Sequence, residues 1–319
     1  MFNIAIRKIM SSQITNTILM VRPLSFGYNE QTAINNYYQK NLNLSYRDIQ
    51  RRALSEFDNF VINLKQNGVN VIVIEDVSKG KTPDSIFPNN WVSFHSNGDV
   101  ALYPMYALNR RKERRIDVFD LLKDKYNFQI NKIMDFSSLE NNGIFLEGTG
   151  SMVFDRKNKI CYAAISERTD RSTVLDFCSQ FNYKPILFTA KQKVGKKRLE
   201  IYHTNVMMSV AESFAIICLD SIDDNEERNL VVNTLINSGK NIIEISESQK
   251  NNFAGNMLQV KGHKAVLVMS STAYNSLSIT QINDIKQECA ILHSPLSTIE
   301  ACGGGSARCM MAEIFLPKA

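Results

Sequence analysis

Polar residues with chemically useful side chains stand just before several apolar, strand-like runs of this sequence. They are Asn89, Asn90, Glu147, His203, Asn205, Asn256 and, behind the Gly303–Gly305 loop, Cys309. If each run begins an equivalent copy of a repeated unit, these residues stand at the same position, or phase, in every copy. Residues at the same phase of a ring of repeats converge in space. A thiol, an imidazole, a carboxylate and several amides in one place are the set that nucleophilic catalysis needs.

Cys309 is the candidate nucleophile. Thiolate is the strongest nucleophile that proteins offer near neutral pH, and the glycines before Cys309 let the backbone approach a ligand closely. The alternative is a buried structural cysteine, which is the commoner role of this residue type. We accept that alternative for Cys161, Cys178, Cys218 and Cys289, whereas Cys302 borders the same glycine loop and its role stays open.

His203 is the candidate general acid and base, because an ordinary imidazole pKa of about 6.5 suits proton transfer at cellular pH. Its alternative role is that of a core histidine bonded to a backbone carbonyl. Glu147 is the candidate partner that orients His203 and stabilises the imidazolium. A helix-capping or surface role is the alternative for Glu147, and its apolar neighbours Ile144, Phe145 and Leu146 argue against it.

A repeated unit of hairpin, helix and strand must position these side chains. The clearest copy has strand-like runs at 91–95 and 100–104 around the turn Ser96–Asp99, a helix over 113–126 and a strand at 130–136. Similar copies follow at 151–190, with Asp170 as helix N-cap, at 206–246 and at 257–293. A fifth copy combines 307–316 with 17–23, a helix over 46–67 and a strand at 70–75.

Five copies, the last completed by the first strand of the chain, describe a ring whose closure removes the sheet edges. We therefore predict an α/β fold, a five-bladed α/β propeller with pseudo-five-fold repeats that is closed by pairing of the N- and C-terminal strands. It would form a single domain over 1–319, with 1–16 as an unassigned N-terminal extension. The alternative is an open doubly wound sheet, which predicts single strands that alternate with helices.

Composition restricts the classes of partner. The net charge is +5, and the densest basic run, Lys191 to Arg198, is interpreted as a solvated loop in preference to an RNA or phosphate contact. The six cysteines show no CxxC pair or histidine at zinc-ligand spacing, so we expect no disulfide, metal or cofactor. Without a signal peptide or an apolar run near ~18 residues, the chain is expected to be cytoplasmic, with no membrane or nucleic-acid partner. A homo-oligomer stays open.

The segments DSIFPNNW, YPMYALNRR, FLEGTG, ISERTD, YHTN and GGGSARCMM occur in this order between residues 84 and 311. Together they resemble the pentein, or guanidino-group-modifying, superfamily of arginine deiminases, dimethylarginine hydrolases and amidinotransferases, and within it the citrulline hydrolases. The resemblance implies the five-bladed propeller and a catalytic set of Cys309, His203 and Glu147. It also implies a covalent intermediate on sulfur without a cofactor.

The substrate-binding residues follow from the same resemblance. In arginine deiminases the positions that match Asn90 and Asn205 are aspartates that hold a cationic guanidinium. Amides at these two positions suit a neutral ureido group, because a guanidinium buried without counter-charges would cost several kcal/mol. The pair therefore favours citrulline over arginine, and Asn89 is counted among the substrate-binding residues with them.

Arginines are expected to bind the carboxylate of the substrate, since a guanidinium matches a carboxylate bidentately. By resemblance the candidates are Arg168 and Arg110, and a surface salt bridge is the alternative for either. Arg308 is a poorer candidate although it adjoins Cys309, because successive strand residues face opposite sides.

We therefore predict a hydrolase that converts L-citrulline to ornithine, ammonia and carbon dioxide through a covalent cysteine intermediate, with the order of C–N cleavage open. Its partner would be a small ureido or guanidino amino acid. One alternative is an arginine deiminase or dimethylarginine hydrolase on the same fold, and an amidinotransferase is less favoured. Another is a non-catalytic pentein binding protein, which would have no reason to keep a cysteine, a histidine and a glutamate together.

Overall fold

Five three-stranded sheets, each a hairpin plus one further strand, organise residues 12–77 and 82–319, which are the residues that the computed structural model describes. The sheets are β3 (Val92–Phe94), β4 (Asp99–Leu102) and β5 (Lys132–Asp135); β6 (Val153–Asp155), β7 (Ile160–Ala164) and β8 (Lys184–Phe188); β11 (Met208–Val210), β12 (Phe214–Ile217) and β13 (Asn241–Glu244); β14 (Leu258–Lys261), β15 (Ala265–Ser270) and β16 (Ala290–Ser294); and β17 (Ala312–Glu313), β1 (Thr17–Arg22) and β2 (Asn70–Glu75). The units predicted from the sequence are thus present.

In each sheet the middle strand pairs antiparallel with one neighbour and parallel with the other. A parallel pair needs a crossover connection, and a helix supplies it in every unit. These helices are α2 (Tyr46–Gln66), α3 (Asp117–Asp124), α5 (Arg171–Phe181), α6 (Asn225–Asn237) and α9 (Ile279–Glu288). The predicted N-cap is confirmed, because the Asp170 side chain accepts a hydrogen bond from the backbone N–H of Thr173 at 2.8 Å.

Short elements join these units and surround the inner ends of the sheets. They are α1 (Glu30–Ala33), η1 (Pro88–Asn90), η2 (Arg110–Glu113), η3 (Ser137–Asn142), α4 (Gly148–Ser151), η4 (Thr204–Val206), η5 (Leu219–Ser221), α7 (Glu247–Asn251), α8 (Ser271–Ser276) and α10 (Ser297–Gly303). The helix expected from residue 113 begins only at Asp117, because η2 ends at Glu113 and the side chain of Glu113 is buried in an ion pair with Arg110.

The first and last strands of the chain pair with one another, as the sequence predicted. Ile18 lies opposite Glu313, Leu19 lies opposite Ala312, and the backbone N–H of Ile314 donates to the carbonyl of Thr17 at 2.9 Å. No described strand joins two of the five sheets, so the open doubly wound alternative is wrong. The observed fold is mixed α/β, and its closure into a propeller ring stays a prediction.

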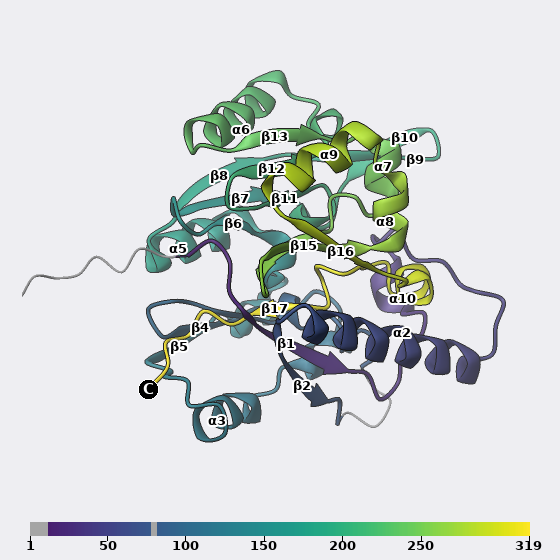
Figure 1. Ribbon diagram of the computed structural model, residues 1–319, viewed down its shortest axis with the longest axis vertical. Coiled ribbons are helices and arrows are strands. Elements are labelled where there is room, and N and C mark those ends of the chain that lie inside the picture. Colours follow the sequence, from purple (N-terminus) through teal and green to yellow (C-terminus); the bar gives the residue numbers. More distant parts are fainter. Residues whose placement is uncertain (1–11, 78–81) are drawn as a thin grey trace, which may run out of the picture.

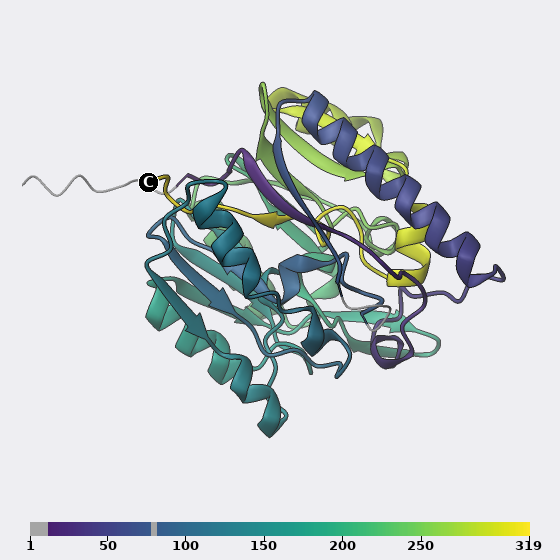
Figure 2. The same ribbon diagram turned by 90° about the horizontal axis from the view of Figure 1, so that it is seen from below.

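The crossover helices lie at the outside of the molecule (Figures 1 and 2). Trp91, Tyr162, Phe177 and Phe214 are among the large side chains of the apolar core that are fully or almost fully buried. Part of the predicted N-terminal extension is anchored, since Gln13 Nε2 donates to the carbonyls of Phe154 and Val210, both at 3.0 Å. The rest of that extension, residues 1–11, lies outside the described residues.

The basic run at 191–198 forms a two-stranded hairpin, which the sequence analysis interpreted as a loop. Its strands are β9 (Lys191–Val194) and β10 (Lys197–Glu200). Gln192 is buried between exposed or half-buried neighbours and accepts a hydrogen bond from the hydroxyl of Tyr38 at 2.7 Å. This inward-facing side chain anchors a segment whose other residues are solvated.

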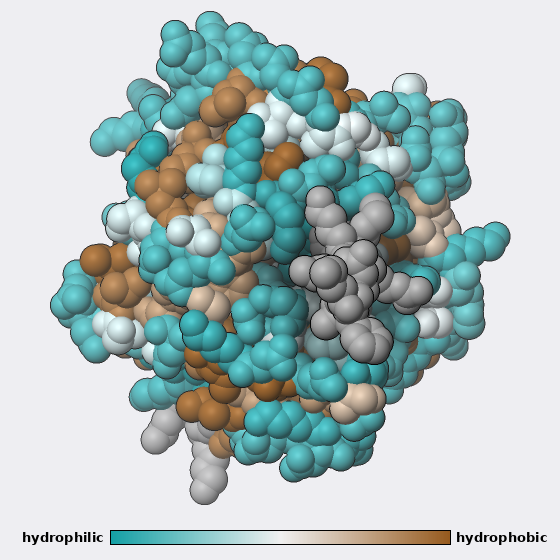
Figure 3. Space-filling view, turned by 90° about the vertical axis from the view of Figure 1, so that its left-hand side faces the viewer, coloured by the Kyte–Doolittle hydropathy of each residue, from teal (hydrophilic) through white to brown (hydrophobic). Residues whose placement is uncertain are grey.

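The face of the molecule in Figure 3 is mainly hydrophilic, with hydrophobic groups scattered between polar ones. Among the described residues, no helix combines the length and the apolar character that crossing a bilayer requires.

Candidate active site

Cys309 lies in a turn between α10 and β17. Its thiol is buried, with 4% of the residue exposed, and its backbone N–H donates to the carbonyl of Ser306 at 3.0 Å. Two side-chain amides reach its sulfur, Asn256 Nδ2 at 3.2 Å and Asn205 Nδ2 at 3.5 Å. The other five cysteines are also free and buried. Cys302 belongs to the same apolar cluster as Cys309, so burial does not separate the two and the role of Cys302 stays open.

Arg308 turns away from Cys309, as expected, but for another reason. The two residues lie in a turn and not in a strand, so strand alternation does not apply. The Arg308 guanidinium donates to Glu313 Oε2 at 2.8 Å and to the carbonyl of Met311 at 2.9 Å.

His203 and Glu147 form a buried pair. His203 Nε2 lies 2.7 Å from Glu147 Oε2, and the other carboxylate oxygen accepts from the backbone N–H of Tyr106 at 2.9 Å. A carboxylate can only accept, so Nε2 carries the proton and Nδ1 is left as the basic nitrogen. A side chain at Gly150 would come within 2.8 Å of that Nδ1, which explains why glycine stands there.

The electrostatic surroundings favour a neutral imidazole beside an ionised carboxylate. Burial lowers the pKa of His203 to about 4, although its hydrogen bond to Glu147 opposes this shift. Burial would raise the pKa of Glu147, but the nearby Arg168 and His203 bring it below its ordinary value. The pair is therefore arranged to accept a proton at Nδ1 near neutral pH.

Arg168 is almost completely buried on the other side of Glu147. Its Nη1 lies 3.5 Å from Glu147 Oε2, and its guanidinium lies over the rings of Tyr106 at 5.3 Å and Tyr202 at 4.9 Å. It also donates to Asn35 Oδ1 and to the carbonyl of Thr32. The segment around α1 thus occupies donors of the arginine expected to bind a substrate carboxylate.

Arg110 and Asn90 contact one another in the same region. Arg110 Nη1 donates to Asn90 Oδ1 at 2.9 Å, while Arg110 Nη2 and Nε donate to Glu113. Asn89 is buried nearby, but it does not line the cavity at Cys309, and its two amide atoms have no hydrogen-bond partner among the described residues. Asn205 does not line the cavity either, but it contacts the Cys309 sulfur, whereas Asn89 contacts neither that sulfur nor the cavity.

A small cavity with room for about one water molecule lies at Cys309. Its lining residues are Thr32, Asn36, Asp84, Phe87, Asn90, Arg110, Arg168, Tyr202, His203, Gly303, Gly305 and Cys309. Predicted residues from five separate segments meet here, namely Asn90, Arg110, Arg168, His203 and Cys309.

Asp84 is a lining residue that the sequence analysis missed. Its Oδ2 accepts from Asn29 Nδ2 at 2.7 Å and from Thr32 Oγ1 at 3.1 Å, and it lies 3.9 Å from Arg110 Nε. Its Oδ1 is buried without a hydrogen-bond partner among the described residues. Burial raises the pKa of Asp84, and Arg110 opposes that shift. The signal was the acidic first residue of DSIFPNNW, six positions before Asn90.

A family model described as "N,N dimethylarginine dimethylhydrolase, eukaryotic" matches residues 22–316. The chain belongs to this family. Membership confirms the predicted pentein superfamily of guanidino-modifying enzymes. No curated protein matches the sequence.

Solved structures share the fold of this family member. ArgZ, an arginine dihydrolase from the ornithine–ammonia cycle in cyanobacteria, superposes with a TM-score of 0.73 at 16% identity over 95% of this chain. The chain spans only 41% of the length of that ArgZ chain. The separate N-terminal domain of ArgZ is covered completely, with a TM-score of 0.70 and 17% identity over 96% of this chain. A dimethylarginine dimethylaminohydrolase adduct with S-methyl-L-thiocitrulline superposes with a TM-score of 0.64 at 13% identity. The match covers 94% of this chain and 100% of that one.

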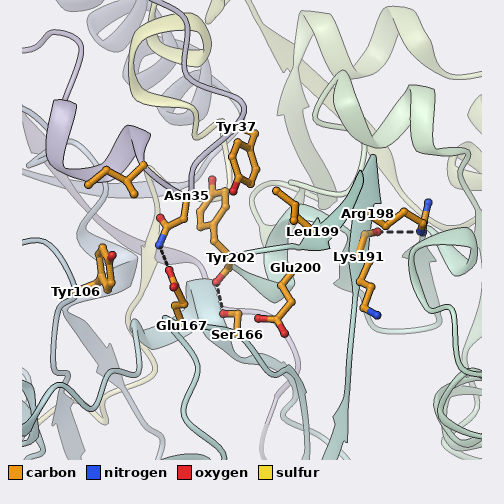
Figure 4. Close-up of a pocket in the computed structure, with 11 residues that line it drawn as sticks. Asn35, Tyr37, Tyr106, Ser166, Glu167, Lys191, Arg198, Leu199, Glu200 and Tyr202 are labelled. Carbon is orange, nitrogen blue, oxygen red and sulfur yellow. Dashed lines mark hydrogen bonds between the residues drawn. The ribbon is translucent and has the colours of Figure 1, made fainter. Parts of the chain in front are cut away.

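A larger pocket of about 530 Å³ lies beside the cavity of this dimethylarginine hydrolase family member. Tyr202 lines both, and Figure 4 shows Asn35 directed toward Glu167, with Asn35 Nδ2 2.8 Å from Glu167 Oε2. Lys191 and Arg198 of the β9–β10 hairpin form its far side.

Among the described residues, no group of three or more histidine, cysteine, aspartate or glutamate side chains could hold a metal ion.

Proposed function

We propose that this protein is a cysteine-dependent hydrolase that breaks a C–N bond at the guanidino carbon of arginine or an N-methylated arginine. The observation that carries the proposal is the meeting of Cys309, the His203–Glu147 pair and the unpaired Asp84 oxygen around one buried cavity. A thiol with a base can attack an electrophilic carbon, and a free carboxylate oxygen can receive a cation. Family membership supports the same substrate class.

The proposed reaction has two halves. The Cys309 sulfur bonds to the guanidino carbon, His203 accepts the thiol proton at Nδ1, and the tetrahedral species then loses ammonia or an amine that takes this proton. Water next attacks the S-linked carbon with His203 as base, and the C–S bond breaks to regenerate the thiol. Glu147 holds the imidazole in position and stabilises its charged form throughout.

Two buried groups are proposed to orient the substrate. Asp84 would pair with a cationic group of the amino acid through its free Oδ1. Arg168 would bind the carboxylate, exchanging its present contacts with Asn35 and Thr32 for bidentate hydrogen bonds. The cavity has room for about one water molecule, so entry of an amino acid requires movement of the segment that holds these contacts.

Citrulline is the second candidate substrate, and a specific observation favours it. The side chains that reach the Cys309 sulfur are amides, those of Asn205 and Asn256, and Asn90 lines the same cavity. Neutral amides match a ureido group better than a guanidinium. In that case the products would be ornithine, ammonia and carbon dioxide.

The test is to offer the purified protein arginine, dimethylarginine and citrulline in parallel and to measure ammonia, amine, citrulline and ornithine. Citrulline formed from arginine or dimethylarginine supports the first candidate, and ornithine formed from citrulline alone supports the second. A Cys309→Ala variant serves as the blank and should show no turnover. Failure of all three substrates, or undiminished turnover by Cys309→Ala, would reject the proposal.

We further infer that the five sheets close into one propeller ring within a single domain. Pairing of β1 with β17 and the contacts of β17 with β3, of β6 with β11 and of β11 with β14 support this arrangement. A cytoplasmic location without a cofactor stays a prediction from the sequence.

A further inference from the structure

We propose that Asn256 is a catalytic residue, whose side-chain amide donates a hydrogen bond to the Cys309 sulfur and, with Asn205, stabilises its thiolate form. The inference deepens the proposed function and rests on it in one respect, namely that Cys309 is the nucleophile. It concerns ionisation of the sulfur and not the identity of the substrate.

The amide of Asn256 is fixed in one orientation by three contacts. Its Nδ2 donates to the Cys309 sulfur at 3.2 Å and to the carbonyl of Asn205 at 3.0 Å, while its Oδ1 accepts from the backbone N–H of Arg308 at 3.1 Å. Oδ1 also lies 3.6 Å from the Cys309 sulfur, where it can accept from the thiol, so the nearer contact to the sulfur is the one made by Nδ2. A flipped amide would set Oδ1 against the carbonyl of Asn205 and lose the Arg308 bond. The N–H aimed at the sulfur is therefore preorganised.

The backbone is built to bring Asn256 this close. Gly255 lies directly before it, and a side chain at Gly255 would come within 2.4 Å of the carbonyl of Val206. Glycine thus allows the turn that precedes β14 to pack against η4, the element that holds Asn205. Asn256 itself is 2% exposed, so water does not compete for its amide.

Asn205 is the weaker of the two donors. Its Nδ2 is 3.5 Å from the sulfur, and its Oδ1 has no hydrogen-bond partner among the described residues. Nothing fixes this amide as three contacts fix Asn256. We therefore assign the larger effect to Asn256.

The cationic side chains near the sulfur are already paired with carboxylates. The charged or titratable groups that line the cavity or adjoin it are Asp84, Arg110, Arg168, His203, Glu147, Arg308 and Glu313, with Tyr202 as a further titratable neighbour. Arg308 is paired with Glu313, and the proton-bearing Nε2 of His203 faces Glu147. Among the described residues, the side-chain N–H groups within hydrogen-bond reach of the sulfur are thus neutral amides. A hydrogen bond to a charged acceptor is roughly twice as strong as one to a neutral acceptor, so these amides favour the thiolate over the thiol.

The experiment measures the pH dependence of Cys309 alkylation by iodoacetamide, without substrate, with the modified thiol identified by mass spectrometry. Asn256→Leu keeps the approximate volume but removes the donor. We expect its alkylation pKa to rise by about one unit or more, and its rate at pH 7 to fall about tenfold or more. Asn251→Leu, an exposed neighbour at the end of α7, is the matched control and should react like the unmodified protein.

A folded Asn256→Leu variant that alkylates within twofold of the unmodified protein at every pH would overturn the inference. Asn256→Ala, which removes the donor without adding a charge, provides a second variant if the first does not fold, and the same shift is expected. If Asn256→Leu shows the alkylation shift but the unmodified protein turns over none of the substrates, the proposed function is rejected and the role of Asn256 at the sulfur is kept.

Discussion

At the scale of single residues, His203 determines how activity should depend on pH. A general base must be unprotonated, and burial lowers the pKa of this imidazole to about 4. We expect kcat/KM to persist as the pH falls from 7 to about 5 and to be lost only as the pH falls through about 4. A pH profile over 4–8 checks this, with His203→Ala, expected to lose about 100-fold or more, as the reference. An acid limb at 6.5 or above would contradict the buried, neutral imidazole.

Asp84 should discriminate between cationic and neutral substrates. Its unpaired Oδ1 is buried in the cavity, and the loss of one partner of a buried charge pair costs about 2–5 kcal/mol. If Oδ1 receives a guanidinium, Asp84→Asn should lower kcat/KM for arginine about 30-fold or more and leave citrulline nearly unchanged. Equal losses for both substrates would place the α-ammonium at Oδ1, because both substrates carry that group. Unchanged kinetics for both would remove Asp84 from substrate binding. Glu167→Gln, at the neighbouring pocket, is a control for general effects of charge.

The meeting of Cys309, His203 and Glu147 could be predicted because all three stand at the same position within the repeated unit. Asn256 stands at that position too, but its proposed role as a donor to the Cys309 sulfur depends on a contact between distant segments. The place of Asp84 depends on such contacts as well, and they leave no local pattern in the sequence. The orientation of Arg308 was predicted correctly on an incorrect premise, since a turn replaces the expected strand.

At the scale of elements, α7 carries a buried lysine whose effect on stability should depend on pH. Lys250 Nζ contacts Tyr38 Oη at 3.2 Å and Gln192 Oε1 at 3.3 Å, and burial lowers its pKa from 10.5 to about 8. Between these values the unfolded chain binds more protons than the native one, so this site makes the free energy of unfolding rise with pH, by up to about 3 kcal/mol in total.

Lys250→Met should abolish that rise. Urea unfolding at pH 7.5 and pH 10 measures it. Ionisation of the tyrosines and cysteines away from Lys250 cancels in the comparison, whereas Tyr38 and Cys218 lie close enough to Lys250 to be affected by its removal. Lys264→Met, at an exposed position, is the matched control and should keep the rise. A Lys250→Met variant with the same pH dependence as the unmodified protein would show that the lysine is charged in the native state.

Elements with periodic apolar patterns and capping residues were predictable, and those held by distant contacts were not. The helix α5 follows from Asp170, and α9 begins after Ser278, which forms a capping box with Gln281. The β9–β10 hairpin is too basic to indicate burial, and it depends on the contact of Gln192 with Tyr38, a residue more than 150 positions away. Tertiary contacts of this kind override local composition.

At the scale of the whole molecule, closure by the two ends of the chain should determine global stability. Ile314 follows β17, is 2% exposed and belongs to the apolar cluster shared by the β17–β1–β2 and β3–β4–β5 sheets. Its backbone is bonded to Thr17 and Thr15 of the first strand region. If the ring is closed, a cavity here weakens a junction on which all the units depend.

Ile314→Ala should therefore lower the free energy of unfolding by about 2–5 kcal/mol, the usual cost of this truncation in a core. Because one cooperative unit is expected, the denaturant midpoint should fall in a single transition with an unchanged slope, and amide exchange should accelerate in β12 and β15 as well as in β1. Ile279→Ala, at a position 79% exposed, is the control and should change stability by no more than about 0.5 kcal/mol. Faster exchange confined to 312–316 with an unchanged midpoint would mean that the terminal strands only cover an open arrangement of sheets.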